Sequence, residues 1–444
     1  MSEKNKYLLP FIVVTTLFFM WGFITVLVDA LVPRLRDVFE LSYFQSGIVQ
    51  FAFFTAYAVF SIPGGNLISK IGYKKGAVVG LITMGIACLL FYPAASFRLF
   101  PIFLLAMFVL AGGITILQVA ANPYIAALGP EKTASSRLNL AQAFNSMGAT
   151  IAPLVSAAFI LSNSVLTSTQ IEALSEPDKL SYYVSEASAV QGPFIVLAVV
   201  LIILALAFAS FKLPEIIRPT DESHGSYKIA LKTKHLMFGA LGIFVYVGAE
   251  VSIGSYLINY FQDLDIETLV AGSLFMSGLA STLSSIFSNE SINDMTAAQL
   301  AGTFVFLYWF FAMVGRFIGS GILQKISAGT LLSIYGVVNV SLLVISMLTV
   351  GYISMWSILL VGLFNSIMFP TIFTLAINNL KEHTAQGSGI LCTAIVGGAF
   401  IPPLYGKIAD LAGLQLALIF IALCYAYIAW YGKIGSKVGN PSYE

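Results

Sequence analysis

The chain has 444 residues, of which 58% are hydrophobic and only 10% are charged, and its mean hydropathy is +0.90. A soluble domain carries about 25% charged residues, so this composition excludes an ordinary soluble protein and indicates one that lies mostly within a bilayer. The net charge of +1 provides no basic surface for a nucleic acid and no acidic tail.

The first apolar run, at about residues 8–33, resembles a signal peptide, but it exceeds about 20 residues and has no small-residue cleavage site. We interpret it as a retained first helix. Further runs lie at about 46–68, 76–95, 100–128, 137–162, 190–212, 236–261, 300–323, 329–350, 354–380, 386–406 and 414–432. The sequence therefore predicts an all-α membrane protein with roughly twelve transmembrane helices.

One further apolar segment, 270–287, is long enough for a thirteenth span. Its serine and glycine content weakens its hydropathy, and counting it would move Lys325 and Lys381 to the opposite side of the membrane. We therefore expect a helix in an outer loop. An even number of spans places both termini on one side, together with most of the lysines, so the positive-inside rule predicts that both termini are cytoplasmic.

The spans fall into two halves separated by a polar linker at 212–235, which predicts an N-terminal six-helix bundle at 1–211 and a C-terminal one at 236–444, with a loop insertion at about 262–298. The halves resemble each other. "QVAANPYIAALGP", from Gln118, matches "NSIMFPTIFTLAI", from Asn365, and this alignment pairs Pro123 with Pro370. Two repeated halves of this kind are typical of secondary transporters.

Two acids lie inside the apolar runs: Asp29, in "VLVDALVP", and Glu250, in "YVGAEVSIGS". An ionised carboxylate at the centre of a bilayer costs at least about 2.5 kcal/mol, so such an acid is expected to face water, a partner or a proton. Neither has an obvious basic partner, because Arg316 lies near the end of its run and can reach the interface. Both are predicted to couple transport to a cation, H⁺ or Na⁺, although a structural bond to another helix is the alternative.

Amide and aromatic side chains within the spans suggest a binding site for a neutral, hydroxyl-rich molecule. An amide offers donors and an acceptor to hydroxyl groups, and an aromatic ring offers an apolar platform. Amides also hold membrane helices together, which is the alternative for each of them. The predicted substrate-binding residues are Gln118, Gln142, Asn145, Asn365, Trp21, Tyr246 and Tyr256.

The loop "GGNLISKIGYKKG" combines glycines with bases at the cytoplasmic rim, and we assign Gly65, Lys70, Gly72 and Lys74 to a structural loop. Gly76 and Gly80 mark a close helix contact. The three cysteines lie in apolar runs and predict neither a disulfide nor a metal site. No complete Walker A, HExxH or GxSxG pattern is present, so neither ATP-driven transport nor an enzyme is expected.

The 65–75 loop resembles the signature loop of the major facilitator superfamily, with Ser69 where an acid is usual and Lys70 in place of arginine. More specifically, "VLVDALVPRL", "QVAANPYIAALGPE", "SSRLNLAQAFNS" and "FPTIFTLAINNL" resemble the fucose, galactose and glucose symporter family. The resemblance implies the major facilitator fold, two six-helix bundles that alternate access to a monosaccharide and a co-transported cation, with no prosthetic cofactor. It implies a multi-pass protein of the bacterial inner membrane that functions as a monomer.

The family resemblance carries the first-helix acid onto Asp29 and the polar pair onto Gln142 and Asn145. Fucose-proton symporters have a glutamate where this chain has Gln118, and an amide where it has Glu250. These differences favour the glucose and galactose branch. The alternatives are an exporter of apolar molecules, which needs fewer amides, and a transport-dead sugar sensor, which would carry a signalling domain.

Overall fold

The structure, a computed structural model, describes residues 3–38, 43–97, 99–159, 173–214, 225–287 and 291–440. Across these ranges the ordered elements are α-helices and short 3₁₀ turns, and no β-strand occurs. Eleven segments of the described chain are long and apolar enough to cross a membrane, and α5, at Ala134–Phe159, adds another long helix. The predicted all-α membrane fold is confirmed.

The chain forms two compact units, which we describe separately. The first comprises 1–128, 147–226 and 382–393, and the second comprises 129–146, 227–381 and 394–444. Each unit thus contains a short segment from the other half of the sequence. The boundaries at 211 and 236, taken from the polar linker, stay a prediction, since residues 215–224 lie outside the described part.

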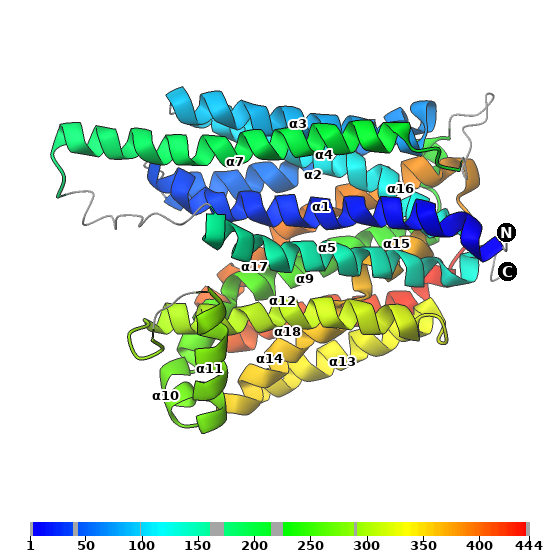
Figure 1. Cartoon of the computed structure of the whole chain (residues 1–444). Helices are drawn as coiled ribbons and strands as arrows, with labels where there is room; N and C mark the ends of the chain where they lie inside the picture. The colour runs from blue at the N-terminus through cyan, green and yellow to red at the C-terminus, as the bar shows by residue number, and fades with distance from the viewer. Residues whose placement is uncertain are drawn as a thin grey trace. The chain divides into compact units, whose positions relative to one another are not determined.

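The first unit is built from long helices. They are α1 (Glu3–Val38), α2 (Tyr43–Ile71), α3 (Tyr73–Phe97), α4 (Phe100–Ala127), the later part of α5, α7 (Glu176–Ser210) and α16 (Thr384–Thr393). Helices α3, α4 and α7 run side by side (Figure 1). α16 packs against α2 and α4, which places a segment from near residue 390 inside this unit.

Glycines let α3 and α4 approach closely. A Cβ atom added to Gly80 would lie 2.8 Å from the Leu117 nitrogen, and one added to Gly113 would lie 2.8 Å from the Met84 nitrogen. No side chain fits at such distances, so the crossing depends on these glycines. The predicted close contact at Gly80 is confirmed, and α4 is thereby fixed against α3.

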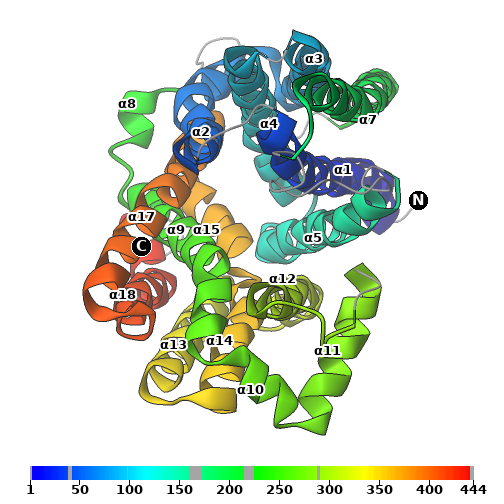
Figure 2. The ribbon, with the colours of Figure 1, turned by 90° about the vertical axis from the view of Figure 1, so that its left-hand side faces the viewer.

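The second unit contains the remaining helices and the start of α5. They are α8 (Tyr227–Ala230), α9 (Lys234–Asp263), α10 (Ile266–Ala271), α11 (Leu274–Phe287), α12 (Ala297–Ile322), α13 (Ala328–Leu348), α14 (Gly351–Asn365), α15 (Met368–Ile377), α17 (Gly397–Ala412) and α18 (Leu414–Lys433). In the end-on view, α9 lies among α12, α14, α15, α17 and α18 (Figure 2). In the described ranges, 3₁₀ turns lie at Glu131–Thr133, Lys381–His383, Ala394–Val396 and Gly435–Lys437.

The segment 270–287 does not form a long span. It contains the end of α10 and the helix α11, which is shorter than the helices that can cross a membrane. A short helix in place of a thirteenth span agrees with the prediction, and its position in an outer loop stays a prediction. The three cysteines, Cys88, Cys392 and Cys424, are buried and free.

The span at 351–377 is interrupted between α14 and α15, at Ser366 and Ile367. Proline has no backbone N–H, so Pro370 cannot donate to the carbonyl group four residues earlier, which belongs to Ser366. Pro123, inside α4, likewise leaves the carbonyl oxygen of Val119 without its helical donor. Both carbonyl groups therefore need partners from elsewhere.

Candidate functional site

Glu250 lies at the centre of a polar cluster in the second unit. Tyr246 and Glu250 are four residues apart on α9, so both lie on the same helix face. The Tyr246 hydroxyl donates a hydrogen bond of 2.8 Å to Glu250 Oε1, and Tyr246 itself is 1% exposed. The phenol therefore fixes one oxygen of a carboxylate inside an apolar helix.

Arg316 supplies the opposite charge. Its Nη2 lies 4.0 Å from Glu250 Oε1, and the two side chains are 14% and 15% exposed. The interpretation that Glu250 has no basic partner is therefore wrong. The sequence placed Arg316 near the end of its span, but in the fold its guanidinium group turns inward from α12 toward α9.

The guanidinium group of Arg316 has further partners from two other parts of the second unit. Its Nη1 donates to the Ser146 hydroxyl on α5, and its Nε donates to the Ser366 carbonyl at 3.2 Å. This carbonyl is the one that Pro370 leaves without a helical donor. The side chain thus joins α5, α12 and the break between α14 and α15, while remaining near Glu250.

Asn365, at the end of α14, is 0% exposed and organises the tyrosines around this cluster. Its Nδ2 donates to the Tyr308 hydroxyl at 2.7 Å, and its Oδ1 accepts from Asn339 Nδ2 at 2.8 Å. Its backbone carbonyl accepts from the Tyr246 hydroxyl at 3.3 Å. The structure therefore brings Tyr246, Glu250 and Asn365 together. Sequence reasoning did not name Tyr308 or Asn339, although an amide inside an apolar span was a usable signal for the latter.

Gln142 and Asn145 lie on the part of α5 that belongs to the second unit, next in the chain to Ser146. Gln142 is 5% exposed and Asn145 is half-buried. This part of α5 is held by Asn139, whose Nδ2 donates to the Arg316 carbonyl at 2.8 Å. Tyr256 packs edge-on against Tyr405, with ring centroids 5.2 Å apart.

The first unit contains a second, smaller group of predicted site residues. Gln118, on α4, is 4% exposed, and its Nε2 donates to the Tyr57 hydroxyl at 2.8 Å. Trp21, on α1, is 9% exposed and lies with its ring centroid 5.5 Å from that of Phe18. Asp29 is also on α1, but its side chain lies outside the part that the structure describes.

The carbonyl group that Pro123 leaves free in the first unit also has a partner from a distant segment. The Ser388 hydroxyl on α16 donates to the Val119 carbonyl at 2.9 Å. Pro123 and Pro370 are paired by the internal repeat, so each half uses the equivalent proline to expose a carbonyl to a side chain. Asn122, beside Pro123, has both side-chain polar atoms buried without a hydrogen-bond partner.

The loop assignment is wrong for three of its four residues, because only Gly72 lies between α2 and α3, while Gly65 and Lys70 lie within α2 and Lys74 in the first turn of α3. Gly72 has φ of +82°, a conformation that glycine adopts without strain. Lys74 donates from Nζ to the Ala209 carbonyl at the end of α7, at 2.6 Å. Gly65 is buried within α2, and Lys70 lies in its last turn.

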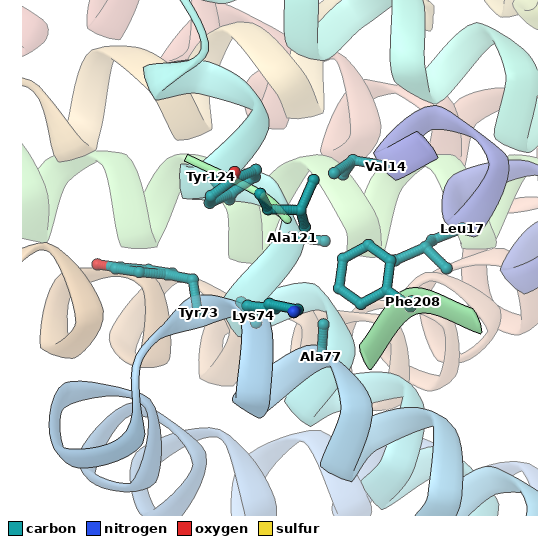
Figure 3. Close-up of a pocket in the computed structure, with 10 residues that line it drawn as sticks. Val14, Leu17, Tyr73, Lys74, Ala77, Ala121, Tyr124 and Phe208 are labelled. Atoms are coloured by element: carbon teal, nitrogen blue, oxygen red, sulfur yellow. The ribbon is translucent and has the colours of Figure 1, made fainter. Parts of the chain in front are cut away.

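A small cavity lies beside this loop. Figure 3 shows it between Tyr73, Lys74 and Ala77 on one side and Val14, Leu17 and Phe208 on the other. Its volume of about 10 Å³ is close to that of a single water molecule, and its lining is almost entirely apolar. It is too small for a sugar. The described residues contain no group of His, Cys, Asp and Glu side chains that could hold a metal ion.

Comparison with known proteins gives consistent matches. Residues 11–403 match the family model described as Major Facilitator Superfamily. The chain is 48% identical over 440 residues to a protein of Brucella abortus named glucose/galactose transporter, covering 98% of this chain and 96% of that one. It is 32% identical over 447 residues to the L-fucose-proton symporter of Escherichia coli, covering 99% and 96% of the two chains.

The fold matches that of a solved transporter. FucP, crystallised in the outward conformation, gives a TM-score of 0.84 at 31% sequence identity, covering 96% of this chain and 98% of that one. The similarity therefore extends through both halves of the chain.

Proposed function

Because the chain belongs to the major facilitator superfamily, we propose that it takes up a monosaccharide, a hexose such as glucose or galactose, by symport with a cation. The observation that carries this proposal is the 48% identity to the glucose/galactose transporter, which extends over 98% of the chain. The acid-containing polar cluster around Glu250 gives the proposal a physical basis. No prosthetic group takes part, since the energy comes from the ion gradient.

The coupling groups in this proposal are the intramembrane acids Asp29 and Glu250. A carboxylate that binds a cation loses its charge, and it can then move between aqueous environments at lower cost. Glu250 already has a neighbouring cation, since Arg316 lies 4.0 Å away. A proton or metal cation that binds Glu250 must compete with Arg316 for the carboxylate. The family resemblance, in contrast, assigns the coupling role to Asp29. We therefore assign the main coupling role to Asp29 and the second role to Glu250.

Sugar recognition is assigned to the amides and aromatic rings. Gln118, whose Nε2 also donates to the Tyr57 hydroxyl, and the amides of Gln142 and Asn145 are assigned to sugar hydroxyl groups, and Trp21 to an apolar face of the sugar. Tyr246 and Asn365 act through the cluster around Glu250, because their polar atoms are already bonded there. Tyr256, further along α9, is assigned an aromatic surface for the sugar.

The coupling cation is H⁺ or Na⁺. The relative in Escherichia coli is named for proton symport. In this chain Gln118 stands where fucose-proton symporters have a glutamate, so a proton relay through that position is not available. The lysine distribution supports the proposal that both termini lie in the cytoplasm. The family resemblance adds a monomer in the bacterial inner membrane to this proposal.

The proposal is tested by uptake of labelled glucose and galactose into proteoliposomes, with H⁺ and Na⁺ gradients imposed separately. A gradient of about 100 mV acting on one co-transported charge supports accumulation of nearly 50-fold. Accumulation of either hexose under one gradient alone is expected. Binding without movement would indicate a sensor, and movement of apolar compounds but not of hexoses would indicate an exporter.

A further inference from the structure

The short helices α10 and α11 both contact α12, and α10 is bonded to the start of α14, so the pair lies at that end of the second unit. α11 runs across the direction of α12 and of the other long helices of this unit (Figure 1). In the end-on view it lies beside α12, at the periphery of the unit (Figure 2). A helix in this orientation is roughly parallel to the plane of a membrane that the long helices cross.

The position of this pair is fixed by contacts with the long helices. The Tyr352 hydroxyl, on α14, donates to the Leu269 carbonyl on α10 at 2.7 Å. On α11, Met276, Ala280 and Leu283 are 1%, 0% and 5% exposed. Their spacing of four and three residues places them on one face, so this face packs against the protein.

A second face of α11 is apolar but is not covered by protein. Phe275 and Ile286 are 67% and 46% exposed, and Leu279 between them is half-buried. Spacings of four and seven residues place these three side chains on one face. Leu274, the first residue of the helix, is 94% exposed but lies outside this face, because it precedes Gly278 by four residues.

After Leu274, the third face is polar or small and is also exposed. It carries Gly278, Ser281 and Ser285, which are three and four residues apart. No Asp, Glu, Lys or Arg occurs between Glu267 and Glu290. Solvated loops usually carry charged residues, so an uncharged segment with large exposed apolar side chains is unusual for water on all sides.

The exposed apolar face of α11 continues into the side of the membrane-crossing helices. The Phe275 ring lies 6.4 Å from that of Trp356 on α14. Ile353 and Tyr352, in the same part of α14, are 60% and 38% exposed. Tyrosine and tryptophan are enriched where a membrane meets water. Trp356 and Tyr352 therefore mark that depth, and Phe275 lies beside them.

We propose that α11 is an interfacial helix whose partner is the lipid bilayer itself. Phe275, Leu279 and Ile286 enter the boundary between headgroups and acyl chains, while Gly278, Ser281 and Ser285 face water. The buried face with Met276 and Ala280 joins the helix to the second unit. From Phe275 to Ile286 this arrangement accounts for the three faces, as expected for an amphipathic helix in the plane of the interface.

The test uses nitroxide labels at single introduced cysteines in proteoliposomes. The variants are Phe275→Cys and Ile286→Cys on the proposed lipid face, and Ser281→Cys and Ser285→Cys as matched controls on the proposed water face. The native cysteines are buried, and the unsubstituted protein measures any label that they accept. Monodispersity and helical content verify that each variant has folded.

Collision rates with oxygen, which concentrates in lipid, and with a water-soluble nickel complex give the result. We expect the oxygen-to-nickel ratio at positions 275 and 286 to exceed that at 281 and 285 several-fold. Equal ratios at the two pairs would overturn the proposal. So would protection of position 275 from both reagents together with dipolar coupling between labels, because that result would place a second copy of the chain on this face.

Discussion

At the scale of single residues, Arg316 connects the polar groups of the second unit. Its side chain contacts Ser146 on α5 and the Ser366 carbonyl, and it lies 4.0 Å from Glu250. Losing one member of a mostly buried charge pair leaves the other without compensation. The stability of this unit should therefore depend on both charges together.

Replacing Arg316 with glutamine should lower the free energy of unfolding by about 3 kcal/mol, because the Glu250 carboxylate then lacks its partner. The double variant Arg316→Gln with Glu250→Gln should recover part of this loss. Thermal unfolding of the purified proteins in detergent measures both effects. If the losses from the two single substitutions simply add in the double variant, the two charges do not interact.

The sequence identified Glu250 but missed its partner for a physical reason. An acid in an apolar run is conspicuous by itself, because its cost in a bilayer is local. The pairing with Arg316 depends on how α9 and α12 pack, and a position in the sequence does not show which way a long side chain turns. Tyr308 becomes recognisable only once the fold brings it to Asn365, whereas Asn339 could have been noticed as an amide inside an apolar span.

At the scale of elements, the paired prolines have a common effect. Pro370 leaves the Ser366 carbonyl for Arg316, and Pro123 leaves the Val119 carbonyl for Ser388. Each bond reaches a helix distant in sequence. In both halves of the repeat, a proline frees one backbone carbonyl group inside a span, and a side chain from another helix then donates to it. Such a donor matters because an unpaired carbonyl group inside a membrane is costly.

Substituting Pro370 with alanine restores an N–H group that competes with Arg316 for the Ser366 carbonyl. A hydrogen bond to a charged group contributes about 1.5 kcal/mol, so we expect uptake to fall about tenfold. Initial rates of hexose uptake measure the effect, and Pro123→Ala tests the equivalent bond between Ser388 and the Val119 carbonyl in the first unit. Unchanged uptake in Pro370→Ala would show that this bond has no part in transport.

The crossing of α3 and α4 gives a second prediction at this scale. Gly80→Ala places a Cβ atom 2.8 Å from the Leu117 nitrogen, so we expect a loss of about 1–3 kcal/mol in stability. Gly192→Ala, on α7, is the control, because nothing lies within 4 Å of its added Cβ atom. Thermal unfolding in detergent should separate the two variants. Equal melting temperatures would contradict the close crossing.

At the scale of the whole molecule, the sequence predicted the long helices well, because hydropathy directly reflects the lipid environment. It also distinguished α11 from a span through its serines and glycines. The break at Ser366 and Ile367 was not predicted, since the surrounding residues are as apolar as those of an unbroken span. Nor could the sequence show that residues 382–393 pack with the first unit, because that assignment depends on long-range contacts.

The predicted topology places the two ends of α12 on opposite sides of the membrane. This topology puts position 281 outside the cell and position 325 in the cytoplasm. A membrane-impermeant thiol reagent added to intact cells should therefore label Ser281→Cys but not Lys325→Cys. Both positions are exposed on the protein, so burial does not explain a difference. Labelling of Lys325→Cys from outside in intact cells would reverse the assigned orientation.

The proposed coupling of sugar movement to a cation at Asp29 can be measured in reconstituted protein. Asp29→Asn and wild type are compared in proteoliposomes for hexose accumulation under an imposed ion gradient and for exchange of labelled against unlabelled hexose without a gradient. We expect the variant to exchange sugar but to lose accumulation. Accumulation that persists in Asp29→Asn at the wild-type level would contradict the account and leave Glu250 as the coupling acid.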